Sequence, residues 1–279
     1  MILLIDFLNY YYRGVITFGK PAPIENGKED NTIIFNFFRN LRSTVEVLKP
    51  NKIIICLEGQ DSFRKKIYPE YKANRIIKAG DIKSEKKIVA KQNILRQAGI
   101  TTELLNHLPV YKCYSDTFEA DDVLYSLANN LYNEDVVIVS NDNDLLQILQ
   151  KKHLNKVRIY NSSKKTFATA PEHFHTLFKV LFGDVSDNIP RLVGEKSAMK
   201  IVESPELLKE FLTSPENLAN FNLNMELVEL KLIPDEQLIF TDYNKNYNKL
   251  KEEFEKMEFN SFFKNDYWER FISTFEGLN

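Results

Sequence analysis

Cysteine is scarce in this chain, because Cys56 and Cys113 are the only two among 279 residues. Cys56 lies inside the apolar run at 53–57, so the pair does not support a disulfide framework and indicates a reducing, intracellular compartment. Long hydrophobic runs are also missing, and none approaches the roughly 20 apolar residues that a membrane-spanning helix needs. The start, MILLID, reaches an acid without a basic lead-in or cleavage site, so we expect no signal peptide. We therefore expect a soluble, cytoplasmic protein with no membrane partner.

A strong excess of charge is lacking as well. The net charge is −2, which by itself argues weakly against an acidic partner such as nucleic acid. Apolar residues are abundant: with 43% hydrophobic content, a chain of this length can bury one large core, or a core and a smaller lobe. These features predict an ordinary globular protein.

The first 160 residues alternate short β-rich runs with longer helical patterns. The β-rich runs cover residues 1–5, 53–57, 101–105 and 136–140. The helical patterns cover residues 31–48, a charged segment up to about residue 99, and residues 119–132. Apolar strands separated by helices predict an α/β fold with a mostly parallel central sheet, flanked by helices on both faces.

Strand patterns stop after about residue 165, and helical patterns follow at 172–181, 196–202 and 205–212. We therefore expect two parts, an α/β core at 1–165 and a helical lobe at 166–279. The tract at 244–258 is rich in Asn, Lys and Glu, which is typical of a solvated face.

Acidic residues follow the apolar runs at the points where the predicted strands end. Asp6 follows ILLI, Glu58 follows IIICL, and SNDND follows VVIV. The motifs FEADD and FGDVSDNIP add further acids. The complete set is Asp6, Glu58, Glu119, Asp121, Asp122, Asp142, Asp144, Asp184 and Asp187. Each acid alone is more often a turn or helix-cap residue. Ligands bind at the carboxyl ends of parallel strands, so three strands that all end in acids favour one shared site.

A shared acidic site requires a cation, because clustered carboxylates repel and raise the pKa of their neighbours. No Cys or His lies at ligand spacing near these acids; His173 and His175 are two apart, on different faces of a helix, and we expect them to be surface or packing residues. Hard oxygen ligands favour two Mg²⁺ ions, with Mn²⁺ as a substitute. Two such ions can activate water and stabilise the leaving oxygen of a phosphodiester, which suggests metal-dependent hydrolysis of nucleic acid.

The remainder of the chain is basic, because removing the nine acids changes the net charge from −2 to +7. Basic residues gather at 64–91, with Tyr68 and Tyr71 among them. They are Arg64, Lys65, Lys66, Lys72, Arg75, Lys78, Lys83, Lys86, Lys87 and Lys91. Basic side chains contact phosphates, and an aromatic ring can stack on an unpaired base. On composition alone, a solvated helix with snorkelling lysines is an equally good interpretation.

Five motifs occur together in the order found in one family. MILLIDFLNYYYR, SFRKKIYPEYKANR, FEADD, VVIVSNDNDLLQIL and GDVSDNIP resemble motifs of the structure-specific 5′-nucleases, over residues 1–202. This group includes bacteriophage 5′→3′ exonucleases and flap endonucleases, the phage RNase H type, and the 5′-nuclease domain of bacterial DNA polymerase I. NLNMELVELKLIP at 222–234 is similar to the segment that follows the core in phage members. The last 45 residues have no counterpart that we can place.

The resemblance implies a PIN-like or resolvase-like core, a helical arch near 62–92 over a two-metal site, and a C-terminal helical lobe. In that lobe a helix-turn-helix element would hold the backbone of duplex DNA. Matching positions imply that one metal, on the catalytic side, is held by Asp6, Glu119, Asp121 and Asp142. The second metal would be supported by Asp144, Asp184 and Asp187, with Asp122 in the same cluster.

The resemblance also implies the contacts with nucleic acid. Lys72 and Arg75 in YKANR match arch residues that contact the scissile phosphate, and Tyr71 matches the ring on which the terminal base stacks. The remaining predicted nucleic-acid contacts are Arg64, Lys65, Gly194 and Lys196.

Two departures from the family pattern concern the site. The family usually has Asp where this chain has Glu58, and the extra methylene shifts the carboxylate by about one bond, a mismatch that a water could bridge. After IP, relatives commonly show a glycine-rich hairpin that binds a phosphate, often with a monovalent cation, whereas RLVGEKSA is two residues shorter and keeps only Gly194. The shorter hairpin weakens the case for a K⁺ ion, although Lys196 and the helix N-terminus still offer a phosphate contact.

The leading hypothesis is a Mg²⁺-dependent 5′→3′ exonuclease and flap endonuclease, acting on DNA with a 5′ flap or a free 5′ end and on RNA/DNA hybrids. It would remove RNA primers and flaps in replication, in the host bacterial cytoplasm if the chain is phage-encoded. We expect a monomer that works beside replication proteins such as a single-strand binding protein. One alternative is a PIN-like ribonuclease, which shares an acidic α/β site. The other is a non-catalytic binder of DNA ends or junctions, suggested by Glu58 and the shortened hairpin.

Overall fold

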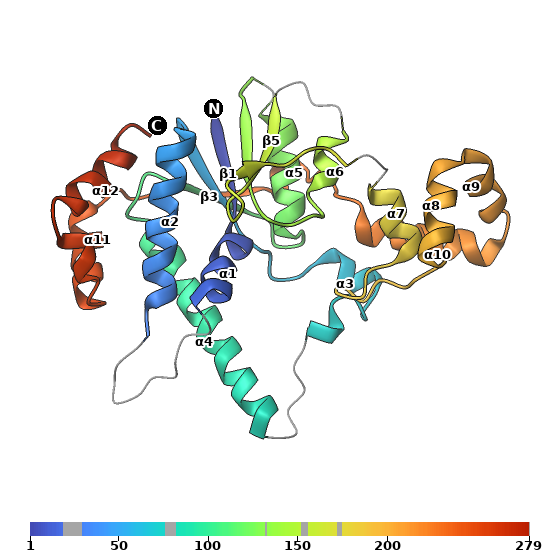
Figure 1. Ribbon diagram of the computed structural model, residues 1–279, viewed down its shortest axis with the longest axis horizontal. Coiled ribbons are helices and arrows are strands. Elements are labelled where there is room, and N and C mark those ends of the chain that lie inside the picture. Colours follow the sequence, from blue (N-terminus) through green and yellow to red (C-terminus); the bar gives the residue numbers. More distant parts are fainter. Residues whose placement is uncertain (19–29, 76–81, 132, 152–155, 172–174, 279) are drawn as a thin grey trace.

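The computed structural model describes residues 1–18, 30–75, 82–131, 133–151, 156–171 and 175–278. At its centre is one seven-stranded sheet in the order β6-β5-β4-β1-β2-β3-β7 (Figure 1). The strands are β1 (Ile2–Asp6), β2 (Lys52–Cys56), β3 (Tyr111–Tyr114), β4 (Val136–Val139), β5 (Val157–Asn161), β6 (Thr166–Phe167) and β7 (Ile239–Thr241). Only the edge strands β6 and β7 run antiparallel to their neighbours. The predicted α/β fold with a mostly parallel sheet is therefore confirmed.

Each central strand is buried on both faces. In β1, Leu3 and Ile5 contact one hydrophobic cluster, whereas Ile2 and Leu4 contact the other. The first cluster is covered by helices α1 (Phe7–Phe18), α2 (Thr32–Leu48) and α4 (Ile82–Leu105). The second is covered by α5 (Ala120–Asn130) and α6 (Leu146–Leu149). This two-sided burial explains why the strands are nearly continuous apolar runs in the sequence.

The strand register brings three strand ends to one edge of the sheet. Ile5 of β1 pairs with Ile55 of β2 on one side and with Val139 of β4 on the other. The residues that follow these positions therefore leave the sheet side by side, which is the position where parallel α/β sheets bind their ligands.

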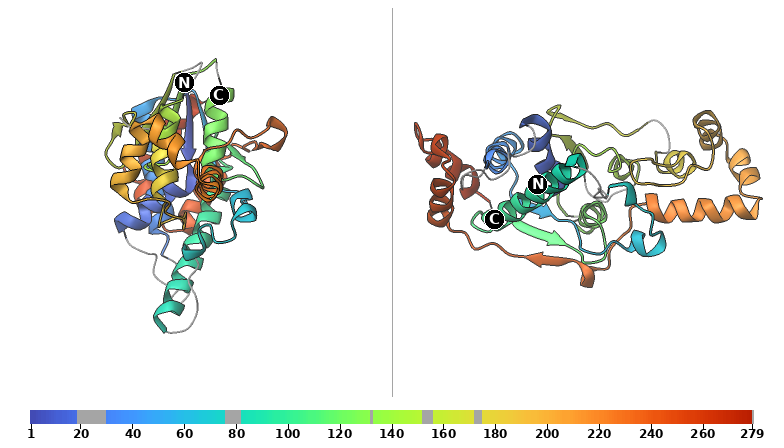
Figure 2. Two further views of the ribbon diagram at one scale, coloured as in Figure 1. Left: turned by 90° about the vertical axis from the view of Figure 1, so that its right-hand side faces the viewer. Right: turned by 90° about the horizontal axis from the view of Figure 1, so that it is seen from below.

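Two groups of helices lie at opposite ends of the molecule (Figure 2). One group is formed by α7 (His175–Phe182), α8 (Glu195–Glu203), α9 (Pro205–Phe211) and α10 (Pro215–Val228). The chain then returns to the sheet through η2 (Asp235–Gln237) and β7. The other group, α11 (Tyr247–Lys256), η3 (Asn260–Phe263) and α12 (Tyr267–Glu276), packs against α2. Among the described residues, no helix combines the length and the apolar character required to cross a membrane.

One predicted strand is wrong. Residues 101–105 form the end of α4, where the Thr101 hydroxyl donates to the Gln97 carbonyl at 2.9 Å and Leu104 and Leu105 are buried. A short run with β-branched residues does not distinguish a strand from a buried helix end, and here packing selects the helix. The strand in this region is β3, which the sequence patterns did not reveal.

The expectation that strands stop near residue 165 is also wrong. β6 pairs with β5, and β7 crosses back to pair with β3 as an edge strand of three residues. Strands this short carry almost no periodic signal. Similarly, α11 within the tract at 244–258 is solvated on one side only, because Leu250 and Phe254 are buried in the core.

The segment expected to form an arch is described in part. It contains α3 (Phe63–Ile67), the 3₁₀ turn η1 (Ala73–Arg75) and the beginning of α4. Lys78, the side chains of Lys83 and Lys86, His173 and the side chain of His175 lie outside the described residues.

Candidate metal centre

Eight of the nine predicted acids line one cleft of about 870 Å³. Asp6 ends β1, Glu58 follows β2 and Asp142 follows β4, as the strand register requires. Glu119 and Asp121 come from the N-terminus of α5, which begins beside the same edge. The remaining three acids of the cleft are Asp144, Asp184 and Asp187.

Ser140 joins two of these acids. Its hydroxyl donates to Asp6 Oδ2 at 2.8 Å and accepts the backbone N–H of Asp142 at 3.0 Å. Asn9 supports the same arrangement, because its amide oxygen accepts the N–H of Asn141 at 2.9 Å while its own N–H donates to Asp6 Oδ1 at 3.3 Å. The sequence motifs did not indicate a role for Ser140 or Asn9, although both residues lie within three residues of a predicted ligand.

The electrostatics of the cleft favour a bound cation. Burial raises the pKa of Asp6 to about 6, and burial together with the nearby Glu119 raises the pKa of Glu58 to about 7. Burial, followed by the charges of Asp6 and Asp142, raises the pKa of Asp121 well above its ordinary value. Carboxylates that resist ionisation next to one another fit hard divalent cations, which would remove the repulsion.

A second group of acids lies next to the first. Oxygens of Asp144, Asp184 and Asp187 lie within 4.8 Å of one another, which is close enough to share one ion. Lys179 of α7 contacts two of them, donating to Asp144 and lying 2.7 Å from Asp184. Although burial opposes the shift, hydrogen bonds from Lys179 and Ser186 lower the pKa of Asp184. Lys179 was not predicted, because nothing in the pattern of α7 distinguishes it from a surface lysine.

The segment DVSDNIP forms a tight turn that delivers these acids. Asp184 and Ile189 exchange both backbone hydrogen bonds, at 3.1 and 2.8 Å. Gly183 precedes the turn with a φ of +78°, and a Cβ there would lie 2.7 Å from the Ile189 carbonyl oxygen. Only glycine adopts this conformation at this approach without strain. The Asp187 carbonyl then accepts the N–H of Lys72 at 2.8 Å, which attaches the turn to the arch segment.

Lys72 and Arg75 both reach the acids of the cleft. Lys72 Nζ lies 2.8 Å from Glu119 Oε1, and the Arg75 guanidinium donates to Asp187. Lys65 is exposed and also lines the cleft. These positions are compatible with contacts to a phosphate held between the acids.

The predicted stacking role of Tyr71 disagrees with the structure. Its side chain is only 3% exposed, packs with Val180 and Ile189, and donates from its hydroxyl to Glu119 Oε2 at 3.0 Å. A ring buried in this way has no face on which a base can stack, so Tyr71 supports Glu119 instead.

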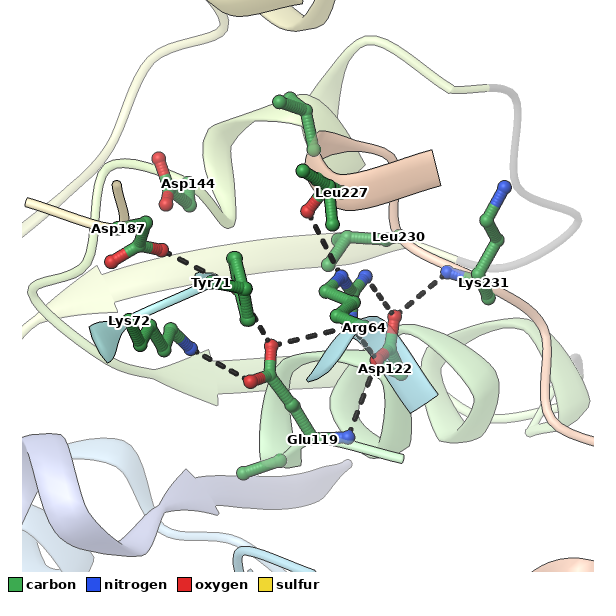
Figure 3. A network of polar contacts seen from close by, with 12 residues as sticks. Arg64, Tyr71, Lys72, Glu119, Asp122, Asp144, Asp187, Leu227, Leu230 and Lys231 are labelled. Atoms are coloured by element: carbon green, nitrogen blue, oxygen red, sulfur yellow. Dashed lines mark hydrogen bonds and ion pairs between the residues drawn. The ribbon is translucent and has the colours of Figure 1, made fainter. Parts of the chain in front are cut away.

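Arg64 and Asp122 also differ from their predicted roles (Figure 3). Arg64 is only 2% exposed and forms a bidentate ion pair with Asp122, which is fully buried. Asp122 does not line the cleft and accepts the backbone N–H of Lys231 at 2.8 Å. Arg64 is therefore not available to DNA, and Asp122 is not a metal ligand in this arrangement.

The shortened hairpin leads into α8. The N–H groups of Leu192 and Val193 both donate to the Leu181 carbonyl, at 3.0 and 3.1 Å, so neither points to a phosphate. Gly194 is the N-cap of α8, and Lys196 lies exposed in its first turn. The phosphate contact predicted for Gly194 and Lys196 remains a prediction that rests on this helix N-terminus.

Residues 1–179 match the family model described as "5′-3′ exonuclease, N-terminal resolvase-like domain". A 5′-3′ exonuclease of Buchnera aphidicola subsp. Baizongia pistaciae is 30% identical over 259 residues, covering 89% of this chain and 77% of the relative. A 5′-3′ exonuclease of Bacillus subtilis is 28% identical over 199 residues, covering 66% of this chain. The matched region spans only 61% of that exonuclease and 26% of the similar Bacillus subtilis DNA polymerase I.

Two solved structures share the fold. Flap endonuclease-1 from Methanococcus jannaschii aligns with a TM-score of 0.66 and 15% identity, covering 98% of this chain and 92% of that one. The bacteriophage T5 D15 flap endonuclease, solved with DNA and metal ions, aligns with a TM-score of 0.62 and 20% identity, covering 82% and 89%.

Proposed function

The chain belongs to the 5′-3′ exonuclease family, and on that premise we propose that it is a Mg²⁺-dependent nuclease that cleaves DNA at free 5′ ends and 5′ flaps. One observation carries the proposal: eight acids from several separate elements line a single cleft that Lys72 and Arg75 also enter. Acids at this density have little reason to gather unless divalent cations bind between them.

The donor set fits two ions of the Mg²⁺ or Mn²⁺ type. Asp6, Glu58, Glu119, Asp121 and Asp142 would hold one. Asp144, Asp184 and Asp187 would hold the other. Bound together, two such ions supply an activated water and charge stabilisation for the leaving oxygen of a phosphodiester. All these ligands are carboxylates, which favours hard cations over zinc.

The protein's own residues position the substrate. Lys72 forms an ion pair with Glu119, and Arg75 forms one with Asp187. When a phosphate enters the cleft, the same two cationic side chains can form ion pairs with it instead. Ser140 keeps Asp6 and Asp142 in a fixed relative position, so that little reorganisation is needed when the cations bind. Lys196 and the N-terminus of α8 would hold the duplex backbone.

We further propose a role for the protein in replication. A monomer in the cytoplasm would remove RNA primers and flaps during replication, with RNA/DNA hybrids as further substrates and a single-strand binding protein as a partner. Sedimentation of the free protein tests whether it is a monomer, and sedimentation of a mixture with a single-strand binding protein tests whether the two proteins associate. A K⁺ requirement would appear as flap binding that increases with K⁺ but not with Na⁺ at equal ionic strength.

The decisive experiment compares a labelled 5′-flap duplex, a blunt duplex and an RNA primer hybrid, each with Mg²⁺, with Mn²⁺ and with chelator. We expect products near the junction that require the metal and disappear in the Asp142→Asn/Asp144→Asn double variant. Cleavage by that variant at the wild-type rate would refute the site. Flap binding without any product would support the non-catalytic alternative, and a preference for plain single-stranded RNA would support the ribonuclease.

A further inference from the structure

Arg64 makes an unusually complete set of contacts. Its Nε donates to the Leu227 carbonyl and its Nη2 to the Glu229 carbonyl, both at 2.9 Å. Nη1 and Nη2 donate to the two oxygens of Asp122, at 2.5 and 2.9 Å. Nη1 also lies 3.3 Å from Glu119 Oε2. A guanidinium has five N–H groups, so five contacts leave no donor for a phosphate.

These contacts join three segments that are distant in the sequence. Arg64 belongs to α3 at the base of the arch segment, Asp122 to the first turn of α5, and residues 227–231 to the last residues of α10 and the segment after it (Figure 3). The three segments therefore meet at one side chain that is buried at 2% exposure.

Glu119 is the residue through which Arg64 reaches the cleft. Its Oε2 accepts from Arg64 Nη1 and, at 3.0 Å, from the Tyr71 hydroxyl. Its Oε1 lies 2.8 Å from the ammonium nitrogen of Lys72, and both residues line the cleft. Asp122 adds a reciprocal capping contact, accepting the Glu119 N–H at 3.3 Å. The orientation of the Glu119 carboxylate thus depends on Arg64 and Asp122 together.

We propose that Arg64 is a positioning residue that fixes Glu119 toward the metal cleft and fastens the arch base to the end of α10, and that it does not bind DNA. The catalytic part of this inference rests on the proposed nuclease function, whereas the metal-binding part does not. Outer contacts of this kind typically change metal affinity or activity by about 10–100-fold.

The test uses the substitution Arg64→Lys, which keeps the positive charge but cannot reproduce the planar, bidentate contact with Asp122. The matched control is Arg42→Lys on α2, where Arg42 pairs with Glu46 at 2.6 Å and does not line the cleft. Calorimetric titration of each full-length protein with Mn²⁺, without DNA, should show roughly 10-fold or greater weakening for Arg64→Lys and no change for Arg42→Lys.

The same proteins are then assayed for flap cleavage and binding. We expect kcat of Arg64→Lys to fall by about 10-fold or more, while KM and the salt slope of flap binding stay at the wild-type value. A salt slope reduced by about one, with Mn²⁺ affinity intact, would identify a phosphate contact and overturn the inference. A lower Tm with unchanged Mn²⁺ affinity would show that Arg64 only stabilises the packing, and this result would also overturn the inference.

A second variant covers the case in which Arg64→Lys does not fold. Tyr71→Phe removes the other donor to Glu119 Oε2 and leaves the buried ring in place, so Mn²⁺ affinity should fall without a loss of folding. Unchanged affinity in that variant would contradict the role given to this oxygen. If the wild-type protein binds Mn²⁺ in an Arg64-dependent manner but cleaves nothing, the nuclease proposal fails and the positioning inference stands.

Discussion

Both the backbone and the side chain of Lys72 are engaged by the acidic cleft. Its φ is +56°, its N–H donates to the Asp187 carbonyl at 2.8 Å, and its ammonium group pairs with Glu119. A non-glycine residue in the left-handed region costs about 1 kcal/mol or more and marks a position that its surroundings enforce. The ammonium is thereby held beside the acids of the cleft, where the proposed function places a phosphate.

Replacement of Lys72 by alanine should therefore slow cleavage more than it weakens binding. We expect flap cleavage under single-turnover conditions to fall by about 100-fold or more, with a change in Kd of less than about 5-fold. The control is Lys256→Ala on α11, whose ammonium pairs with Glu253 at the surface. Equal losses in cleavage rate and in flap affinity would show that Lys72 does not act at the scissile phosphate.

The raised pKa values of Asp6 and Glu58 predict that the metal-free protein becomes less stable as the pH rises. Without metal, the folded state retains a proton on Asp6 up to its pKa of about 6 and on Glu58 up to its pKa of about 7. The unfolded chain loses both protons at lower pH, near the ordinary pKa values of Asp and Glu. The folded state therefore binds more protons in this window, and stability must fall as the pH rises through it. Because Mg²⁺ binds the ionised forms, it should reverse the loss.

Thermal unfolding in chelator should show Tm falling between pH 5 and pH 8. Saturating Mg²⁺ should raise Tm by about 5 °C or more at pH 8 and by less at pH 5. Glu58→Gln removes one of the titrating groups and should flatten the metal-free profile. A Tm that rises with pH in chelator would show that burial does not raise the pKa of Asp6 and Glu58 in the way inferred.

At the scale of elements, the turn after α7 determines whether two acids reach the cleft. Gly183 is the point at which the chain leaves α7 with positive φ, and its missing Cβ allows the Ile189 carbonyl to approach. Asp184 and Asp187 follow directly, so the second acidic group depends on a backbone conformation and not only on the presence of its side chains.

Gly183→Ala should destabilise the protein by about 2 kcal/mol or more and weaken Mn²⁺ binding at the same time. Gly99→Ala is the matched control, because Gly99 lies inside α4 with no atom within 4 Å of an added Cβ. The control should be neutral or stabilise by up to about 1 kcal/mol. Chemical denaturation with and without Mn²⁺ measures both effects, and equal behaviour of the two variants would contradict this account of the turn.

At the scale of the whole molecule, the C-terminal helices are part of the α/β core. Phe262 of η3 is fully buried, with its ring centroid 4.9 Å from that of Phe254 in α11 and 5.1 Å from that of Phe35 in α2. Phe271 of α12 joins the same cluster at 5.2 Å. The C-terminal residues, which the sequence motifs could not place, therefore close one side of the sheet that carries Asp6.

Phe262→Ala should cost about 3–5 kcal/mol of unfolding free energy, as expected for a large ring removed from a core. Phe240→Ala, on the edge strand β7 where the side chain is 53% exposed, should cost less than about 1 kcal/mol. Denaturant titration of both variants measures the difference. A small loss at Phe262 would mean that the C-terminal helices are a loosely attached addition.

The class of fold and the edge of the sheet at which the acids meet could be predicted from the order of the residues. Apolar runs separated by helical patterns predict a parallel sheet. Because the carboxyl ends of parallel strands lie at one edge, Asp6, Glu58 and Asp142 were expected to be neighbours. Short edge strands such as β7 were not predictable, because three residues contain less than two periods of alternation. The buried face of α11 was hidden among its charged residues.

Which members of each charged group lie at the cleft depends on contacts between segments that are distant in the sequence. Asp121 and Asp122 are adjacent, but successive residues of a helix point about 100° apart, so one faces the cleft and the other is buried against Arg64. Arg64 and Lys72 belong to one basic run, yet contacts with residues 227–231 bury the first, and the DVSDNIP turn holds the second at the acids. Local composition cannot separate these cases, because the partners that separate them lie more than 50 residues away along the chain.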